Sequence, residues 1–279
     1  MKFSIIITNR IQNECHMRVY LILLSIMAYP IFSTGQVFQA YDTTIVINES
    51  VSIHFQSIPA GSFYQGSDTS EPNRQKDEGP RHAVHISRGF YLATFEVTQQ
   101  QWQSIMGSNP AIFSNLPHAK NRPVESVSWQ ECQDFIGKLN QKNIGTFRLP
   151  TEAEWEYACR AGSRSAYYWG EQMAENGSSD YAWANSRSMA MTHPVGQKKP
   201  NNWGLYDMSG NVWEWCSDWY GPYPAEEVTD PKGPVDGKMK VFRGGSWYDF
   251  FESHRSANRH KHAPDEKYTA IGFRLLLEK

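Results

Sequence analysis

Two carboxylates, Asp207 and Glu214, stand seven residues apart in the segment GLYDMSGNVWEW, with Gly210 between them. Calcium prefers several hard oxygen ligands from carboxylates and backbone carbonyls, held by a loop in which glycine allows a sharp turn. This spacing therefore predicts a calcium site. A purely structural alternative is that Asp207 caps a turn and Glu214 pairs with an arginine.

A second group of potential ligands follows Ser246 and consists of Asp249, Glu252, His254, His260 and His262. His260 and His262 are two residues apart, so they would share one face of an extended strand, which is compatible with metal binding. A solvated loop is the favoured interpretation, because these two histidines flank Lys261.

Residues 1–36 differ from the rest of the chain. Arg18 precedes the apolar run VYLILLSIMAYPIF, and the small residues Ser33-Thr34-Gly35 follow at the spacing that a signal peptidase accepts. The run is shorter than the roughly twenty residues that a membrane helix needs, and Pro30 interrupts it. We expect an upstream extension plus a secretory signal peptide, and therefore a secreted or periplasmic mature protein.

Removal of this signal would take Cys15 and leave Cys132, Cys159 and Cys216. An odd number of cysteines after export requires at least one free thiol or an intermolecular bond. Cys132 lies on the apolar stripe of a predicted helix, where it is expected to be a small buried hydrophobe. A bond between Cys159 and Cys216 is the one pairing considered, and spacing does not establish it.

Capping boxes predict three helices, since Ser or Thr is followed three residues later by Glu or Gln at Thr98/Gln101, Ser128/Glu131 and Thr151/Glu154. The second helix should lie on a core, because apolar residues recur at helical spacing at Cys132, Phe135, Ile136 and Leu139. Left-handed C-caps are expected at Gly107 and Gly162, which follow the first and third helices.

Short extended runs are predicted at 52–59, 82–92, 240–247 and 271–278, between stretches rich in Gly, Pro, Asn and Ser. Residues 163–235 show little periodicity. The chain is 40% hydrophobic, 14% aromatic and carries a net charge of −2, so it can form a core but offers no basic field for nucleic acid. We expect one α+β domain over residues 37–279, with little regular secondary structure.

Seven segments together resemble the formylglycine-generating enzyme, or sulfatase-modifying factor, family in their order and spacing. They are IPAGSFYQGS (58–67), FEVTQQQW (95–102), PVESVSWQEC (123–132), RLPTEAEWEYACRAG (148–162), GLYDMSGNVWEWCSDWY (204–220), RGGSW (243–247) and IGFRL (271–275). The resemblance implies a formylglycine-generating enzyme-like fold related to C-type lectins, with structural calcium. In the family, the positions matching Asp207, Gly210, Val212 and Glu214 hold one calcium ion, the Gly and Val through their carbonyls.

A second family calcium site begins at the positions matching Asn185 and Ser186 and continues to an acidic residue. The stretch SRSMAMTH (186–193) contains no carboxylate, so this site should be weakened or lost.

The active enzymes of this family oxidise a client cysteine to formylglycine with oxygen and copper(I), which two cysteines beyond the GGS motif hold. Asp249 matches the first cysteine, the second falls within the Phe251–His254 stretch, and no cysteine follows Cys216. Copper(I) is soft, so oxygen ligands do not replace thiolates. We therefore expect neither bound copper nor a catalytic residue.

Ser246 and Trp213 match positions at the family's catalytic pocket, and with Trp247 and Asp249 they are candidates for a binding pocket. The favoured hypothesis is a pseudoenzyme whose loop surface, residues 247–268, binds a protein or glycan at the cell envelope. Aromatic residues suited to anchoring a partner lie there at Trp247, Tyr248, Phe250 and Phe251, although half of them could be core.

Two other functions remain open. One is a divergent formylglycine-generating oxidoreductase that acts on sulfatase cysteines with a different metal or none. The other is an extracytoplasmic subunit of an envelope machine, which the sequence does not distinguish from a free binding module.

Overall fold

The structure, a computed structural model, describes residues 42–171, 180–185 and 188–279. The predicted signal peptide, Cys15 and Ser186 lie outside the described residues. Within the described part of the chain, no helix is long and apolar enough to cross a membrane.

The three predicted helices are present as α1 (Gln99–Met106), α2 (Trp129–Asn140) and α3 (Glu152–Arg160), each with its complete capping box. The apolar stripe of α2, Cys132, Phe135, Ile136 and Leu139, is buried as expected. Single 3₁₀ turns occur at η1 (Lys76–Glu78), η2 (Ile112–Asn115), η3 (Ala119–Asn121) and η6 (Phe251–His254). The helix starts were thus predictable because capping is local chemistry.

The left-handed C-cap of α1 is Gly107, at φ 82°, as the sequence predicts. The cap of α3 is Ala161 (φ 44°) rather than Gly162, which follows with φ 89°. Two consecutive residues therefore take left-handed backbone here, and the glycine supplies the second. Alanine tolerates the first position at a steric cost of about 1–2 kcal/mol.

The strands form three sheets. The order β1-β2-β5-β12-β6 comprises Thr43–Asn48, Val51–Ile58, Phe90–Ala93, Leu276–Leu277 and Phe147–Arg148. The order β10-β9-β7-β11 comprises Arg259–His262, Lys240–Arg243, Trp213–Trp219 and Ile271–Gly272. The order β3-β4-β8 comprises Gly61–Gln65, His82–Ile86 and Val228–Thr229. Mixed sheets with few helices confirm the α+β class.

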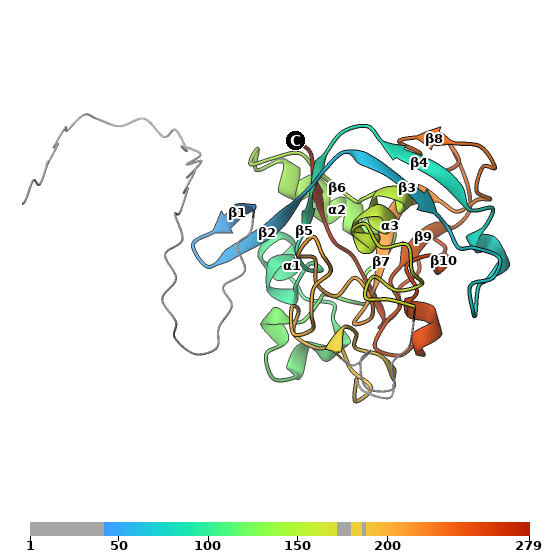
Figure 1. Ribbon diagram of the computed structural model, residues 1–279. Helices are drawn as coiled ribbons and strands as arrows, with labels where there is room; N and C mark the ends of the chain where they lie inside the picture. Colours follow the sequence, from blue (N-terminus) through green and yellow to red (C-terminus); the bar gives the residue numbers. More distant parts are fainter. Residues whose placement is uncertain (1–41, 172–179, 186–187) are drawn as a thin grey trace, which may run out of the picture. The chain divides into compact units, whose positions relative to one another are not determined.

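Strand β7 is the main element that the sequence did not predict, because it lies in the apparently aperiodic stretch 163–235. Its residues are buried on both faces over most of its length, so polar and apolar residues do not alternate along it. It pairs with β9 on one side and with β11 on the other. Figure 1 shows β7, β9 and β10 running beside one another, and this sheet carries the candidate site.

Two buried apolar clusters hold these layers together. One contains the stripe of α2 and a stack of Trp102 on Phe135, whose ring centroids are 5.3 Å apart. The other surrounds α3 and contains Cys159 and Cys216. All three described cysteines, these two and Cys132, are buried free thiols, so the considered disulfide is not formed.

Candidate functional site

Asp249, at the position that matches the first copper cysteine, lies between two other predicted pocket residues. Its Oδ2 accepts hydrogen bonds from Trp213 Nε1, at 2.8 Å, and from the Ser246 hydroxyl. Its backbone N–H donates to the Ser246 carbonyl at 3.2 Å. Because Trp213 starts β7 and Ser246 follows the neighbouring β9, the sheet brings together residues that are distant in sequence.

The fourth predicted pocket residue, Trp247, has another role. Its side chain is buried, its Nε1 donates to the Thr269 carbonyl at 3.2 Å, and its ring meets Phe113 edge to face at 5.4 Å. Trp247 therefore anchors the loop to the body of the domain rather than lining a pocket beside Asp249.

His254 lies at the end of the stretch that matches the second copper cysteine. It is buried, with Nδ1 2.9 Å from the Phe250 carbonyl and Nε2 3.1 Å from the Ser246 carbonyl. Burial lowers the pKa of His254, and the Asp249 carboxylate opposes that shift. The neutral imidazole has one N–H, which can donate to one of these two carbonyls. Because both ring nitrogens face backbone carbonyls, His254 braces the loop instead of presenting a ligand.

The remaining loop ligands do not converge. His260 and His262 do share one face of β10, as predicted, and their rings lie 5.8 and 5.5 Å from that of Phe242. His262 Nδ1 is 2.8 Å from Glu266 Oε2, and Glu252 is half-buried in η6. Across residues 42–171, 180–185 and 188–279, no three His, Cys, Asp or Glu side chains gather as metal ligands.

Glu214, one of the predicted calcium ligands, is buried in an ion pair with Arg274. Its two carboxylate oxygens each lie 2.6 Å from an Arg274 nitrogen, and Oε2 also accepts from Trp155 Nε1 at 2.7 Å. This is the arginine pairing that the structural alternative predicts. By count of lone pairs, Oε1 keeps one acceptor position free.

In the turn around Asp207, both Asp207 and Gly210 take left-handed backbone. Asp207 is buried at φ 55°, and its Oδ2 accepts the Gly196 N–H at 2.7 Å. Gly210 takes φ 88°, and a Cβ there would lie 2.4 Å from the Trp183 carbonyl oxygen, so only glycine fits. Val212, whose carbonyl is the remaining predicted ligand, is fully buried just before β7.

A third buried carboxylate, Glu96, belongs to the same charge cluster and was missed by sequence reasoning. Neither of its oxygens has a hydrogen-bond partner among the described residues. Burial, with the charges of Asp207 and Glu214, raises the pKa of Glu96, and burial raises the pKa of Asp207 to about 6. Arg274 offsets only part of this negative charge. The three carboxylates supply the hard oxygens that calcium prefers, although among the described residues their side chains do not converge as one ligand group.

Asn185, which begins the second family calcium site, lies beside the Asp249 loop. It is exposed, and its backbone N–H donates to the Asp249 carbonyl at 3.0 Å. Its own carbonyl accepts from the Ser188 hydroxyl at 3.2 Å. The backbone of Asn185 therefore holds the Asp249 loop in place through a hydrogen bond that requires no ion.

The loop and the segments that contact Trp247 expose four large apolar side chains. Tyr248 is 67% and Phe250 72% exposed, whereas Trp247 is buried and Phe251 half-buried, so half of the four aromatics face inwards. Ile112 and Met189 are also exposed, and their chain neighbours Phe113 and Ser188 both contact Trp247. The side chains that share this exposure, Ile112, Met189, Tyr248 and Phe250, are called the apolar patch below.

Comparisons with known proteins give a family match and several relatives. The model of the sulfatase-modifying factor enzyme 1-like domain matches residues 48–279. The chain is 30% identical to the formylglycine-generating enzyme of Mus musculus, over 78% of this chain and 73% of that one. It is 32% identical to the serine/threonine-protein kinase pkn1 of Chlamydia pneumoniae, over 78% of this chain but only 36% of that longer protein.

Two solved structures share the fold at length. Treponema denticola variable protein 1 superimposes with a TM-score of 0.78 at 30% identity, covering 86% of this chain and 100% of that one. PvdO from Pseudomonas aeruginosa gives a TM-score of 0.75 at 26% identity, with the same coverage.

Proposed function

We propose that this chain, which belongs to the sulfatase-modifying factor enzyme 1-like family, is a non-catalytic member that holds a protein partner on its apolar patch. The family match over residues 48–279 and the relative in Mus musculus show the membership. The matched solved structures confirm the formylglycine-generating enzyme-like fold that the resemblance implied.

Asp249 is the observation that carries the proposal. Its hard carboxylate replaces a soft thiolate, and both donors that reach it, Trp213 and Ser246, come from the protein itself. No cysteine follows Cys216 in the sequence. The thiol of Cys159 is buried, and this burial raises its pKa to about 12, so it stays protonated at neutral pH. The chain thus supplies no thiolate pair where the active enzymes need one.

The patch favours a protein partner over a glycan. Aromatic residues and Met are enriched at the centres of protein interfaces, and the patch exposes Phe250, Tyr248 and Met189 together with Ile112. Aliphatic side chains such as Ile112 offer no hydrogen bond to sugar hydroxyls. If the protein is exported as proposed, the partner would lie at the cell envelope. We also propose that a calcium ion at Asp207, Gly210, Val212 and Glu214 stabilises the fold there.

Site-specific photocrosslinking in the producing cells tests the patch. A photoreactive residue at Tyr248 should give one discrete protein adduct, and Phe250→Ser should remove it because the patch loses its most exposed ring. The matched control is the same probe at Val235, an exposed apolar residue outside the patch, which should give no such adduct. A glycan adduct, no adduct, or an adduct insensitive to Phe250→Ser contradicts the proposal.

A further inference from the structure

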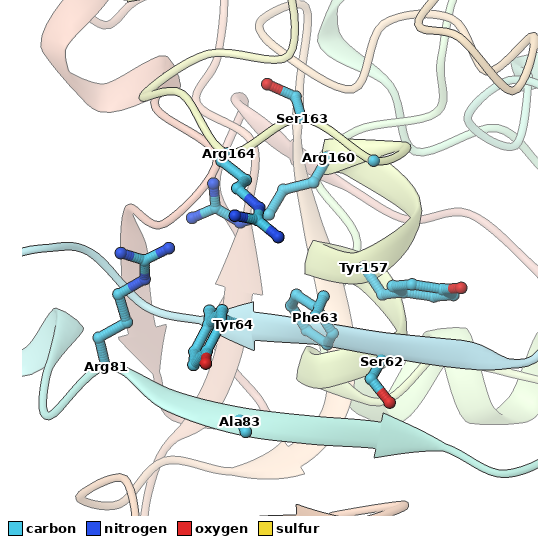
Figure 2. Close-up of a pocket in the computed structure, with 10 residues that line it drawn as sticks. Ser62, Phe63, Tyr64, Arg81, Ala83, Tyr157, Arg160, Ser163 and Arg164 are labelled. Carbon is cyan, nitrogen blue, oxygen red and sulfur yellow. The ribbon is translucent and has the colours of Figure 1, made fainter.

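A cavity of about 340 Å³ opens between the β3–β4 hairpin and the C-terminal end of α3, and shares no lining residue with the apolar patch (Figure 2). Among the described residues that line it are three arginines, Arg81, Arg160 and Arg164, and no acidic residue. In Figure 2 the arginine side chains project towards the same space above Tyr64 and Phe63.

The three arginines differ in how far they are already neutralised. Arg160 is buried and paired with Glu156 at 2.8 Å. Arg81 is 3.8 Å from a carboxylate oxygen of Asp68, a long and partly exposed contact. Arg164 is exposed, and within the described part of the chain its guanidinium has no hydrogen bond or ion pair. The cavity therefore carries surplus positive charge, concentrated on Arg164.

The opposite wall is aromatic. Tyr64 is half exposed, and the guanidinium carbon of Arg81 lies 4.9 Å from its ring centroid. Phe63 and Tyr157 pack with centroids 5.3 Å apart behind it. An aromatic face suits the apolar face of a sugar ring, whereas the planar guanidinium fork matches a sulfate or carboxylate. The volume is in the range of small-molecule pockets and exceeds what a bare oxyanion needs.

We infer that this cavity binds an anionic saccharide, whose sulfate or carboxylate pairs with Arg164 and Arg81 while the sugar ring packs against Tyr64. This site goes beyond the proposed function and does not depend on it. Both ligand sources, a sulfate ester and a uronate, offer a pair of anionic oxygens that can accept two hydrogen bonds from one guanidinium.

Titration calorimetry at low ionic strength tests the inference with four probes: a 6-sulfated chondroitin disaccharide, its desulfated uronate form, neutral lactose and inorganic sulfate. At least one of the first two should bind, and the comparison between them shows which anion is used. Lactose should not bind, and inorganic sulfate should bind more weakly than the disaccharide because it leaves Tyr64 without a contact.

Variants locate the site. Arg164→Gln should weaken binding about tenfold or more, as expected for a lost charge-assisted hydrogen bond. The affinity of Arg164→Lys should lie between those of the wild type and Arg164→Gln, because lysine keeps the charge but lacks the planar guanidinium. Tyr64→Ala should weaken binding, whereas Tyr64→Phe should retain it. Since Arg164 has no partner among the described residues, its variants should melt as the wild type does.

Three results would overturn the inference: no binding of either anionic disaccharide, equal binding of lactose, or unchanged binding by Arg164→Gln. Inorganic sulfate binding as tightly as the disaccharide would also contradict it, since the ring would then contribute nothing. A Tyr248→Ser variant should bind the disaccharide normally, so failure of the apolar patch and failure of this cavity are distinguishable.

Discussion

At the scale of single residues, the buried pair of Glu214 and Arg274 connects the Asp207 turn to the last strands. Arg274 also donates to the Ala93 carbonyl at 3.0 Å, so one guanidinium joins three segments. Removing one member of a buried pair leaves an uncompensated charge, which costs about 3–5 kcal/mol.

Arg274→Ala should therefore lower the free energy of unfolding by about 3–5 kcal/mol, because Glu214 would remain buried without its partner. Urea denaturation monitored by tryptophan fluorescence measures this. Lys199→Ala is the matched control, since it breaks the exposed pair with Asp180 and should leave the midpoint unchanged. Equal effects of the two changes would show that the buried pair is not a major restraint.

Asp218 in β7 gives a prediction about pH. Burial, together with the charge of Glu152, raises its pKa to about 7, above that of an aspartate in the unfolded chain. A raised carboxyl pKa means that the folded state binds the proton more tightly, so this stabilisation is complete below about pH 4 and is lost as pH rises through 7.

Asp218→Asn should then be closest to the wild type in stability near pH 4 and exceed it near pH 8, because the amide has no charge to bury. Each unit of pKa shift corresponds to about 1.4 kcal/mol, so the difference is measurable by thermal melts at the two pH values. Asp134→Asn, at an exposed position, is the control. Parallel pH profiles for wild type and Asp218→Asn would refute the assignment.

At the scale of elements, the sequence predicts those elements that are determined by residues close together in the chain. The capping boxes at Thr98, Ser128 and Thr151 could be read from four residues each, and all three formed. Strand β7 could not, because burial on both faces removes the alternation that marks a strand. Strand β7 is buried because it lies between β9 and β11, and its sequence alone does not reveal these neighbours.

The cap of α3 is directly testable. The Thr151 hydroxyl accepts the Glu154 N–H at 3.1 Å, so Thr151→Ala should cost about 1 kcal/mol of unfolding free energy. Thr151→Ser keeps the hydroxyl and should stay close to the wild type. Chemical denaturation compares the three proteins, and a serine variant as unstable as the alanine variant would show that the cap is not the cause.

The turn that carries Asp207 should bind calcium and gain stability from it, because the ion binds only the folded state. A chelator should lower the melting temperature, and calcium at about 100 times its dissociation constant should return about 2.7 kcal/mol. Asp207→Asn should abolish this response. An unchanged melting temperature in excess chelator would contradict the calcium site and would indicate that the Glu214–Arg274 pair stabilises the turn without an ion.

At the scale of the whole molecule, the fold was predictable because seven motif segments are spread along nearly all of residues 48–279. Their order specifies one topology, even where the elements between them lack periodicity. The surfaces were not predictable in the same way. Whether Tyr248 or Trp247 faces outwards depends on contacts with Phe113 and Thr269, and the arginine cavity combines β3, the start of β4 and the end of α3.

Under the proposed function, this chain keeps the scaffold of the family without the catalytic cysteines. Trp213 begins β7 and Ser246 follows the paired strand β9, and both side chains donate to Asp249. Restoring one thiol should therefore not restore catalysis, because Asp249→Cys would still lack a second thiolate. The Phe251–His254 stretch, which matches the second cysteine, contains His254 instead, and both of its ring nitrogens face backbone carbonyls.

Mass spectrometry of a CxPxR peptide, incubated under air with the copper-treated protein, tests the central claim of a non-catalytic site most directly. An active formylglycine-generating enzyme serves as the positive control, and a sample without protein as the negative one. We predict that wild type and Asp249→Cys both leave the cysteine mass unchanged, because neither can form the two-thiolate copper(I) site. Appearance of the aldehyde mass above the protein-free sample would contradict the account and identify the chain as an enzyme.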